Sequence, residues 1–214
     1  LIGILSALVK SRYNILISGA TDSGKSSLLN ALAEYIGKRE RVITIEDSAE
    51  LQLFHVENLV RLETRNANME GENEITMQDL IKASLRMRPD RIIVGEVRGA
   101  EAMSMLQALS TGHSVSVSSI HANSCRDALR RLETMVLMGM DMPLAAIQGL
   151  IASSVDILIH LGRLTTGKRK ILEICEIKDY SRAEYDIRTL FQYKAGQTES
   201  LEMTGKLFHT EKLK

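Results

Sequence analysis

The stretch "ISGATDSGKSSLLNAL" at residues 17–32 decides the fold, because it places a glycine-rich loop between an apolar run and a helical pattern. Gly19, Gly24, Lys25 and Ser26 match the phosphate-loop signature G-x-x-x-x-G-K-[ST]. Glycines let backbone N–H groups turn toward phosphate oxygens, the lysine reaches the outer phosphates, and the serine hydroxyl is a ligand for Mg²⁺. A helix beginning near Lys25 adds its positive dipole. The stretch predicts a site for a nucleoside triphosphate.

One acid lies inside this loop. Asp22 occupies a free position of the signature, and aspartate adopts positive φ more readily than most residues. Its charge disfavours phosphate by roughly 2 kcal/mol at about 8 Å and an effective dielectric near 20, before Mg²⁺ and Lys25 neutralise it. We expect Asp22 to weaken nucleotide binding without abolishing it.

Strand and helix patterns alternate along the rest of the chain. Near-continuous apolar strands between helices predict an α/β fold with a mostly parallel sheet. The patterns from residue 156, "DILIHL", "RKILEICEI" and "YDIRTLFQY", predict a C-terminal antiparallel β extension. Residues 47–74 are polar and acid-rich, and no strand is predicted there. The expected strands are 14–18, 41–46, 91–96 and 114–121, and the expected helices are 1–9, 25–36, 76–88, 100–111, 124–138 and 143–153.

Composition narrows the class of protein. The 214 residues suit one domain, and their 27 basic and 27 acidic residues cancel. With three Phe, five Tyr and no Trp to stack bases, we expect no nucleic-acid partner.

Cys125 and Cys175 form neither a CxxC pair nor a disulfide framework, which favours a reducing compartment, and we expect Cys125 to be inert. No run approaches the roughly 18 apolar residues of a membrane span. Because the chain begins at Leu1 without Met, we expect it to be part of a longer one.

Acids and a histidine follow the predicted strands. Glu46, Asp47 and Glu50 come at or after the end of the second strand, Glu96 ends the third, and His121 ends the fourth. In an open parallel sheet, ligands bind outside the carboxyl ends of the strands. Phosphoryl transfer to water needs Mg²⁺ ligands, a group that orients the water, and positive charge on the γ-phosphate. The sequence therefore predicts hydrolysis of a nucleoside triphosphate at this edge.

Four further stretches carry a family resemblance. "RVITIEDSAELQL", "LVRLETR", "LRMRPDRIIVGEVRGAEAMSMLQALSTGH" and "SIHANS" resemble the Asp/Glu box, Walker B region and His box of the type II/type IV secretion ATPases. The sequence is most similar to the tight-adherence (Flp/Tad) pilus assembly branch, from about residue 12 to at least residue 175. The resemblance implies a RecA-like P-loop NTPase core, a hexameric ring, and ATP turnover with Mg²⁺ at the inner membrane.

The resemblance also implies roles for individual residues. Lys25 and Ser26 would hold phosphate and Mg²⁺, Glu96 would be the Walker B carboxylate that completes the metal site, and Glu50 would be the general base. His113 and His121 would form the His-box pair, with His121 sensing the γ-phosphate. The other implied nucleotide-binding residues are Gly19, Thr21, Gly24 and Ser27, and the implied supporting residues are Glu46, Asp47 and Arg98.

The same resemblance implies the setting. Residues 1–214 would be the C-terminal ATPase domain of a homo-hexameric protein that is cytoplasmic, peripheral to the inner membrane, and engaged with a membrane platform protein. The absent N-terminal domain usually supplies nucleotide-contacting arginines, and the candidates within this chain are Arg86, Arg88 and Arg98. Two alternatives stay open: a nucleotide-binding regulator that no longer hydrolyses, which Asp22 would permit, and a RecA-like nucleic-acid motor.

Departures from the family pattern concern two loops. Asp22 stands where the family usually has Gly, and Ser26–Ser27 stand where Thr–Thr is common. Ser114 and Val115 replace an expected Asp and Gly after His113, so this loop is expected to behave differently.

Overall fold

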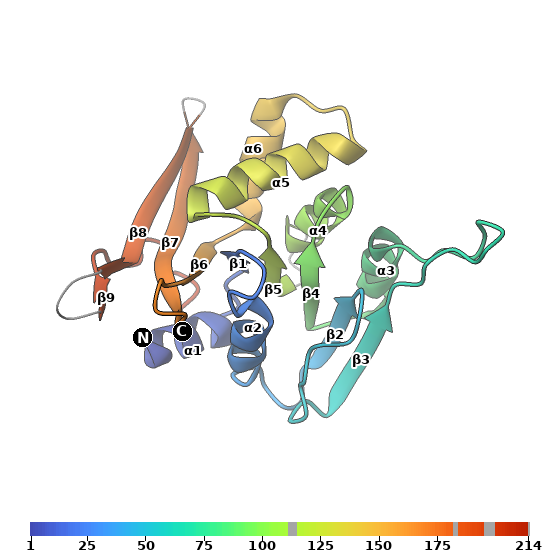
Figure 1. Ribbon diagram of the computed structural model, residues 1–214, viewed down its shortest axis with the longest axis horizontal. Helices are drawn as coiled ribbons and strands as arrows, with labels where there is room; N and C mark the ends of the chain where they lie inside the picture. Colours follow the sequence, from blue (N-terminus) through green and yellow to red (C-terminus); the bar gives the residue numbers. More distant parts are fainter. Residues whose placement is uncertain (111–114, 182–183, 195–199, 214) are drawn as a thin grey trace.

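A computed structural model describes residues 1–110, 115–181, 184–194 and 200–213. In this part of the chain, one nine-stranded sheet has the order β3-β2-β4-β5-β1-β6-β7-β8-β9 (Figure 1). The first six strands in this order, from β3 through β1 to β6, run parallel to one another. The last three, β7, β8 and β9, continue the sheet in antiparallel pairing. The strands are β1 (Ile15–Gly19), β2 (Arg41–Glu46), β3 (Asn58–Glu63), β4 (Arg91–Val97), β5 (Val115–Ile120), β6 (Ile157–Arg163), β7 (Arg169–Ser181), β8 (Glu184–Lys194) and β9 (Ser200–Met203). The expected α/β class with an antiparallel extension is confirmed.

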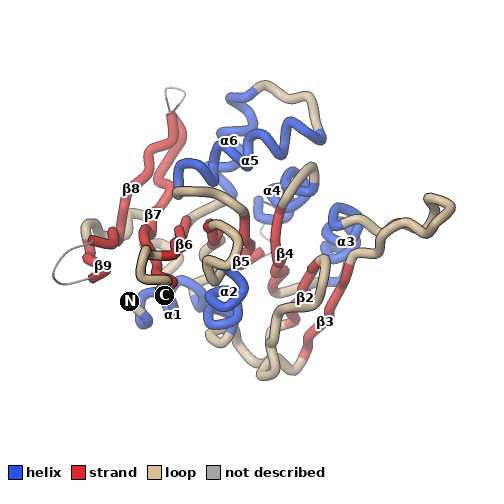
Figure 2. Tube along the Cα trace, viewed as in Figure 1, coloured by secondary structure: helices blue, strands red, loops and turns tan. Residues whose placement is uncertain are grey.

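Helices cover both faces of the sheet (Figure 2). Successive β1 side chains alternate between the two layers, so Leu16 packs into one core while Ile15 and Ile17 pack into the other. One layer holds α1 (Ile2–Lys10) and α2 (Lys25–Ala33), and the other holds α3 (Met77–Ser84), its 3₁₀ continuation η1 (Leu85–Met87), α4 (Glu101–Ser110), α5 (Cys125–Gly139) and α6 (Leu144–Ser154). Among the described residues, no helix has the length and apolar character that crossing a bilayer requires.

The topology brings the phosphate loop to the centre of the sheet. β1 pairs with β5 on one side and β6 on the other, and the chain leaves it through α2 to reach β2 near the far edge. This crossing aligns the carboxyl ends of β1, β2, β4 and β5 along one edge, where ligands bind in such sheets.

Local chemistry explains several boundaries. Thr76 and Asp79 form a reciprocal capping box at the start of α3, and Ser124 caps α5 by accepting the N–H of Asp127 at 3.0 Å. The helix predicted over 76–88 ends as an α-helix at Ser84, where the chain tightens into the 3₁₀ turn η1, and Arg88, just before Pro89, has a left-handed backbone with φ of 53°. The helix predicted over 25–36 ends at Ala33.

Three predictions about strands were wrong. Residues 47–74 contain β3, an edge strand in which exposed polar positions interrupt the three residues, Leu59, Val60 and Leu62, that pack on the two cores. β9 is also an unpredicted edge strand. β6 pairs parallel to β1, so the antiparallel extension begins at β7 and not at residue 156.

Candidate functional site

A cavity of about 490 Å³ opens where the carboxyl ends of β1, β2, β4 and β5 meet. The predicted site residues that line it are Thr21, Gly24, Lys25, Ser26, Ser27, Glu46, Asp47, Glu50, Glu96, Arg98 and His121. Gly19 lies at the end of β1, beneath the loop. His113, together with the altered residue Ser114, lies outside the described residues. The structure therefore brings together the phosphate loop, acids and a histidine from four separate segments.

The loop between β1 and α2 has the shape of a phosphate cradle. Asp22 adopts φ of 59° and Gly24 φ of 99°, and the N–H of Ser23 donates to the carbonyl of Ala20 at 3.2 Å. A Cβ at position 19 would lie 2.8 Å from the backbone oxygen of Leu161 and 2.3 Å from the Oγ of Ser23, so a larger residue does not fit. The two glycines therefore serve close packing and a left-handed turn, and the N-terminus of α2 faces the cavity.

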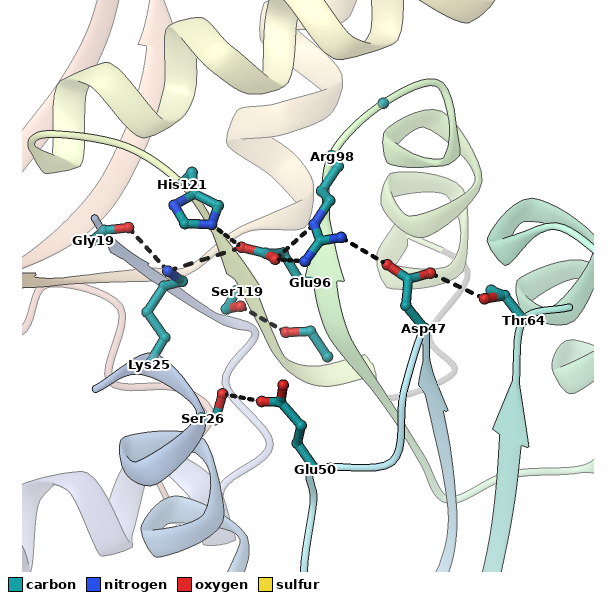
Figure 3. Close-up of polar contacts among 12 residues, drawn as sticks. Gly19, Lys25, Ser26, Asp47, Glu50, Thr64, Glu96, Arg98, Ser119 and His121 are labelled. Atoms are coloured by element: carbon teal, nitrogen blue, oxygen red, sulfur yellow. Dashed lines mark hydrogen bonds and ion pairs between the residues drawn. The ribbon is translucent and has the colours of Figure 1, made fainter. Parts of the chain in front are cut away.

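Lys25 spans this loop from the first turn of α2 (Figure 3). Its Nζ donates to the carbonyl oxygens of Gly19 and Ala20, each at 3.1 Å, and lies 3.9 Å from Oε1 of Glu96. Burial lowers the pKa of the Lys25 ammonium, and the nearby Glu96 carboxylate opposes that shift. The cation is thus held at the mouth of the cradle, where an anion would meet it.

Two glutamates after β2 differ in their surroundings. Glu46 is 4% exposed, and its Oε1 accepts the N–H groups of Glu50 at 2.9 Å and Leu51 at 3.0 Å. Burial raises the pKa of the Glu46 carboxyl. Glu50 faces the cavity and accepts a 2.8 Å hydrogen bond from Ser26 Oγ. Glu46 therefore anchors the segment that presents Glu50 to α2.

Glu96 is the centre of a second polar group (Figure 3). Nε2 of His121 lies 2.9 Å from its Oε1, and Nε of Arg98 donates to its Oε2 at 2.7 Å. Arg98 also reaches Asp47 at 3.1 Å, and Asp47 accepts from Thr64 at 3.1 Å. The hydrogen bond to Glu96 raises the pKa of the Arg98 guanidinium. These contacts join β4, β5 and the segments that follow β2 and β3 at the rim of the cavity.

The donor set fits Mg²⁺ and a triphosphate. Mg²⁺ prefers oxygen ligands and keeps several waters, so one hydroxyl and one or two carboxylates suffice. Ser26 Oγ and Glu50 Oε2 are already within one hydrogen bond of each other, whereas Glu96 contacts Lys25, His121 and Arg98. Ser26 would thus meet the metal beside Glu50, and Glu96, which lines the same cavity, offers a further carboxylate.

Arg169 is a cavity residue that the sequence did not indicate. It begins β7, and its Cδ lies 3.4 Å from the place a Cβ on Gly24 would occupy. Among the described residues, no ion pair or hydrogen bond holds its guanidinium, unlike that of Arg98. Arg86 and Arg88, the other predicted arginines, do not line the cavity. The basic run "KRK" at 168–170 is the only local signal that could have indicated it.

Comparisons with known proteins agree with this geometry. The family model described as "Type II/IV secretion system protein" matches residues 2–207. The putative conjugal transfer protein Rv3659c of Mycobacterium tuberculosis is 39% identical over 175 residues, covering 82% of this chain and 49% of the relative. The VirB11 ATPase of the Brucella suis type IV secretion system, solved with sulphate, has a TM-score of 0.74 and 34% identity over 81% of this chain and 51% of its own. The pilus retraction motor PilT with bound ADP has a TM-score of 0.62 and 25% identity over 87% and 50%. The chain thus spans about half the length of these relatives.

Proposed function

The chain belongs to the type II/IV secretion system protein family, and we propose that it is the ATP-hydrolysing domain of a motor that powers pilus assembly or protein secretion. The observation that carries the proposal is the convergence at the phosphate loop. Lys25 lies 3.9 Å from Glu96, which contacts His121, and the Ser26–Glu50 pair lines the same cavity. Phosphoryl transfer requires such a set of cation, hydroxyl and carboxylates around the phosphates.

Each residue then has a chemical role. The glycine loop and Lys25 bind the phosphates, and Ser26 and Glu96 would hold Mg²⁺, which would neutralise phosphate charge. Glu50 orients and deprotonates the attacking water, and Glu46 fixes its position through the two backbone N–H groups. His121, 2.9 Å from Glu96, is placed to respond to the γ-phosphate. Arg169 supplies positive charge from within the chain.

A proposal about the setting is supported by the family. We propose that residues 1–214 form the C-terminal ATPase domain of a longer, homo-hexameric protein, because the relatives are about twice as long as the matched segment. The relatives' names concern conjugal transfer, type IV secretion and pilus retraction. They support a motor that is cytoplasmic, peripheral to the inner membrane, and coupled to a membrane platform protein. Assignment to the tight-adherence branch stays a prediction.

Two other functions make different predictions. A regulator that only binds nucleotide would retain affinity for ATP and show no turnover even in a single-turnover assay. A nucleic-acid motor would bind single strands with the steep salt dependence of phosphate contacts, whereas this neutral chain should show weak binding at every salt concentration.

ATP hydrolysis by the full-length protein tests the proposal. We expect Mg²⁺-dependent release of phosphate that Lys25→Ala abolishes, because that variant loses the cation at the loop. Thr134→Ala, an exposed substitution on α5 away from the cavity, is the matched control and should leave turnover unchanged. Binding of ATP without hydrolysis in the assembled protein would exclude the motor and favour the regulator.

A further inference from the structure

The two cysteines, fifty residues apart in the sequence, meet in the core behind the nucleotide cavity. Cys125 is the first residue of α5, Cys175 lies in β7, and each is 1% exposed. α5 begins beside β7 (Figure 1), and both thiols belong to the core cluster on this face of the sheet. Glu173 precedes Cys175 by two residues on the same strand, so its side chain projects from the same face. One ligand atom from each of the three residues lies within 4.8 Å of the other two.

The chemistry of this cluster favours a cation. The backbone N–H of Cys125 makes only a long 3.4 Å contact to Glu173 Oε2. In the described part of the chain, Glu173 pairs with neither a lysine nor an arginine, although it is only partly exposed.

We propose that Cys125, Cys175 and Glu173 form a site for a thiophilic divalent cation, with Zn²⁺ the expected ion. Two sulfurs and one oxygen are a donor set that Zn²⁺ accepts, with a fourth position left open. Zn–S bonds of about 2.3 Å and Zn–O bonds of about 2.1 Å place tetrahedral ligand atoms roughly 3.4–3.8 Å apart, so the side chains need to contract by only about 1 Å. Binding replaces the two S–H protons, which pass to solvent, with one Zn²⁺. The partly exposed Glu173 marks the route of entry.

The location gives the site a consequence for the nucleotide cavity. His121 lies four positions before Cys125, on the segment between β5 and α5. Glu173 pairs across the β6–β7 ladder with His160, whose Nδ1 lies 3.0 Å from the Oγ of Ser18, the residue before Gly19. A bound cation would therefore tie α5 to β7 directly behind the loop that holds phosphate.

Cadmium titration of the reduced, metal-stripped protein tests the site, because Cd²⁺ bound by thiolates absorbs in the ultraviolet. We expect this absorbance to saturate at one equivalent, Zn²⁺ to displace the Cd²⁺, and Zn²⁺ to raise the melting temperature. These are the only thiols in the chain, and Cys125→Ser and Cys175→Ser should each lower the affinity at least about tenfold. Glu173→Gln should keep the absorbance and weaken binding about tenfold, whereas Glu211→Gln, an exposed carboxylate near the C-terminus, should change nothing.

Three results would overturn the proposal. They are the absence of thiolate absorbance in the parent, equal Cd²⁺ affinity of the parent and Glu173→Gln, and a Cys125–Cys175 disulfide in air whose reduced form takes up no Cd²⁺. If the cysteine variants fail to fold, Glu173→Gln and the parent still decide the matter. Zn²⁺ held at His121 and Glu96 would give no thiolate absorbance, so it cannot mimic the expected result. The outcome is independent of whether the protein hydrolyses ATP.

Discussion

Removing the charge of Asp22 should tighten ATP binding. Asp22 lines the cavity, is exposed, and adopts φ of 59° at the tip of the phosphate loop. Its carboxylate lies close enough to Lys25 to favour the ammonium, so it competes with phosphate for the same cation. Asp22→Asn removes this competition and keeps a side chain that tolerates positive φ.

The expected gain is modest, because the carboxylate is exposed. A unit charge about 8 Å from a phosphate at an effective dielectric near 20 costs roughly 2 kcal/mol. Solvent, salt and Mg²⁺ reduce this to about 0.6–1 kcal/mol, a three- to fivefold gain in affinity. Asp22→Gly removes the same charge but loosens the free loop, at a cost of about 0.5–1 kcal/mol. We therefore expect Asp22→Asn to bind ATP more tightly than Asp22→Gly, and both effects to shrink at high salt.

Calorimetric titration with a non-hydrolysable ATP analogue and Mg²⁺, at two salt concentrations, measures these differences. Asp141→Asn is the matched control, since it makes the same change at an exposed position in the turn between α5 and α6. Equal or weaker affinity in both Asp22 variants would show that the carboxylate points away from the phosphates. Tighter binding by Asp22→Gly alone would show that backbone geometry, and not charge, limits affinity.

Three further predictions address the other side chains of the cavity. Glu50→Gln should bind ATP and turn it over at least about 10²-fold more slowly, and near-normal turnover in this variant would move the base role to Glu96. Hydrolysis by Glu96→Gln should require a higher concentration of Mg²⁺. Because burial raises the pKa of Glu46, the native state binds its proton more tightly than the unfolded state, so the free energy of unfolding should fall as pH rises above the ordinary glutamate pKa. Glu46→Gln should flatten that fall in urea unfolding measured between about pH 4 and pH 7, and an unchanged slope would contradict the assignment. Arg169→Ala should weaken ATP binding about tenfold relative to Arg163→Ala, a neighbouring arginine bonded to the Gly167 carbonyl, and equal affinities would remove Arg169 from the site.

Local signals in the sequence were sufficient for the centre of the fold. The phosphate loop is contiguous, its glycine spacing follows from backbone geometry, and its flanking strand and helix have clear patterns. β3 was missed for a physical reason: Leu59, Val60 and Leu62 of this edge strand pack on the two cores but are only partly buried, and exposed polar residues interrupt them, so its pattern looks polar. The end of α3 was misjudged because helical periodicity continues through η1, where the chain has already tightened into a 3₁₀ turn.

Two contacts between segments that are far apart in the sequence could not be predicted from it. Arg169 approaches Gly24 because β6 lies between β1 and β7, an order that no local pattern specifies. The meeting of Cys125 and Cys175 depends on the same placement, since α5 must return over the face of β7. Both features require the order of the strands, which only the folded structure supplies.

The acids after β2 show how burial divides a cluster that the sequence presents as one. Glu46 and Glu50 are separated by only three residues, and a parallel sheet delivers both to the same edge. Burial distinguishes them: Glu46 is 4% exposed and accepts two backbone N–H groups, whereas Glu50 reaches the hydroxyl of Ser26. A buried carboxylate that accepts two backbone N–H groups resists reorientation. A carboxylate that faces a polar cavity can replace its hydrogen bond from a serine with a contact to a metal or a water. Glu46 therefore sets the position from which Glu50 can act. Glu46→Gln should disturb the position of Glu50, whereas Glu50→Gln should keep that position and remove the carboxylate chemistry.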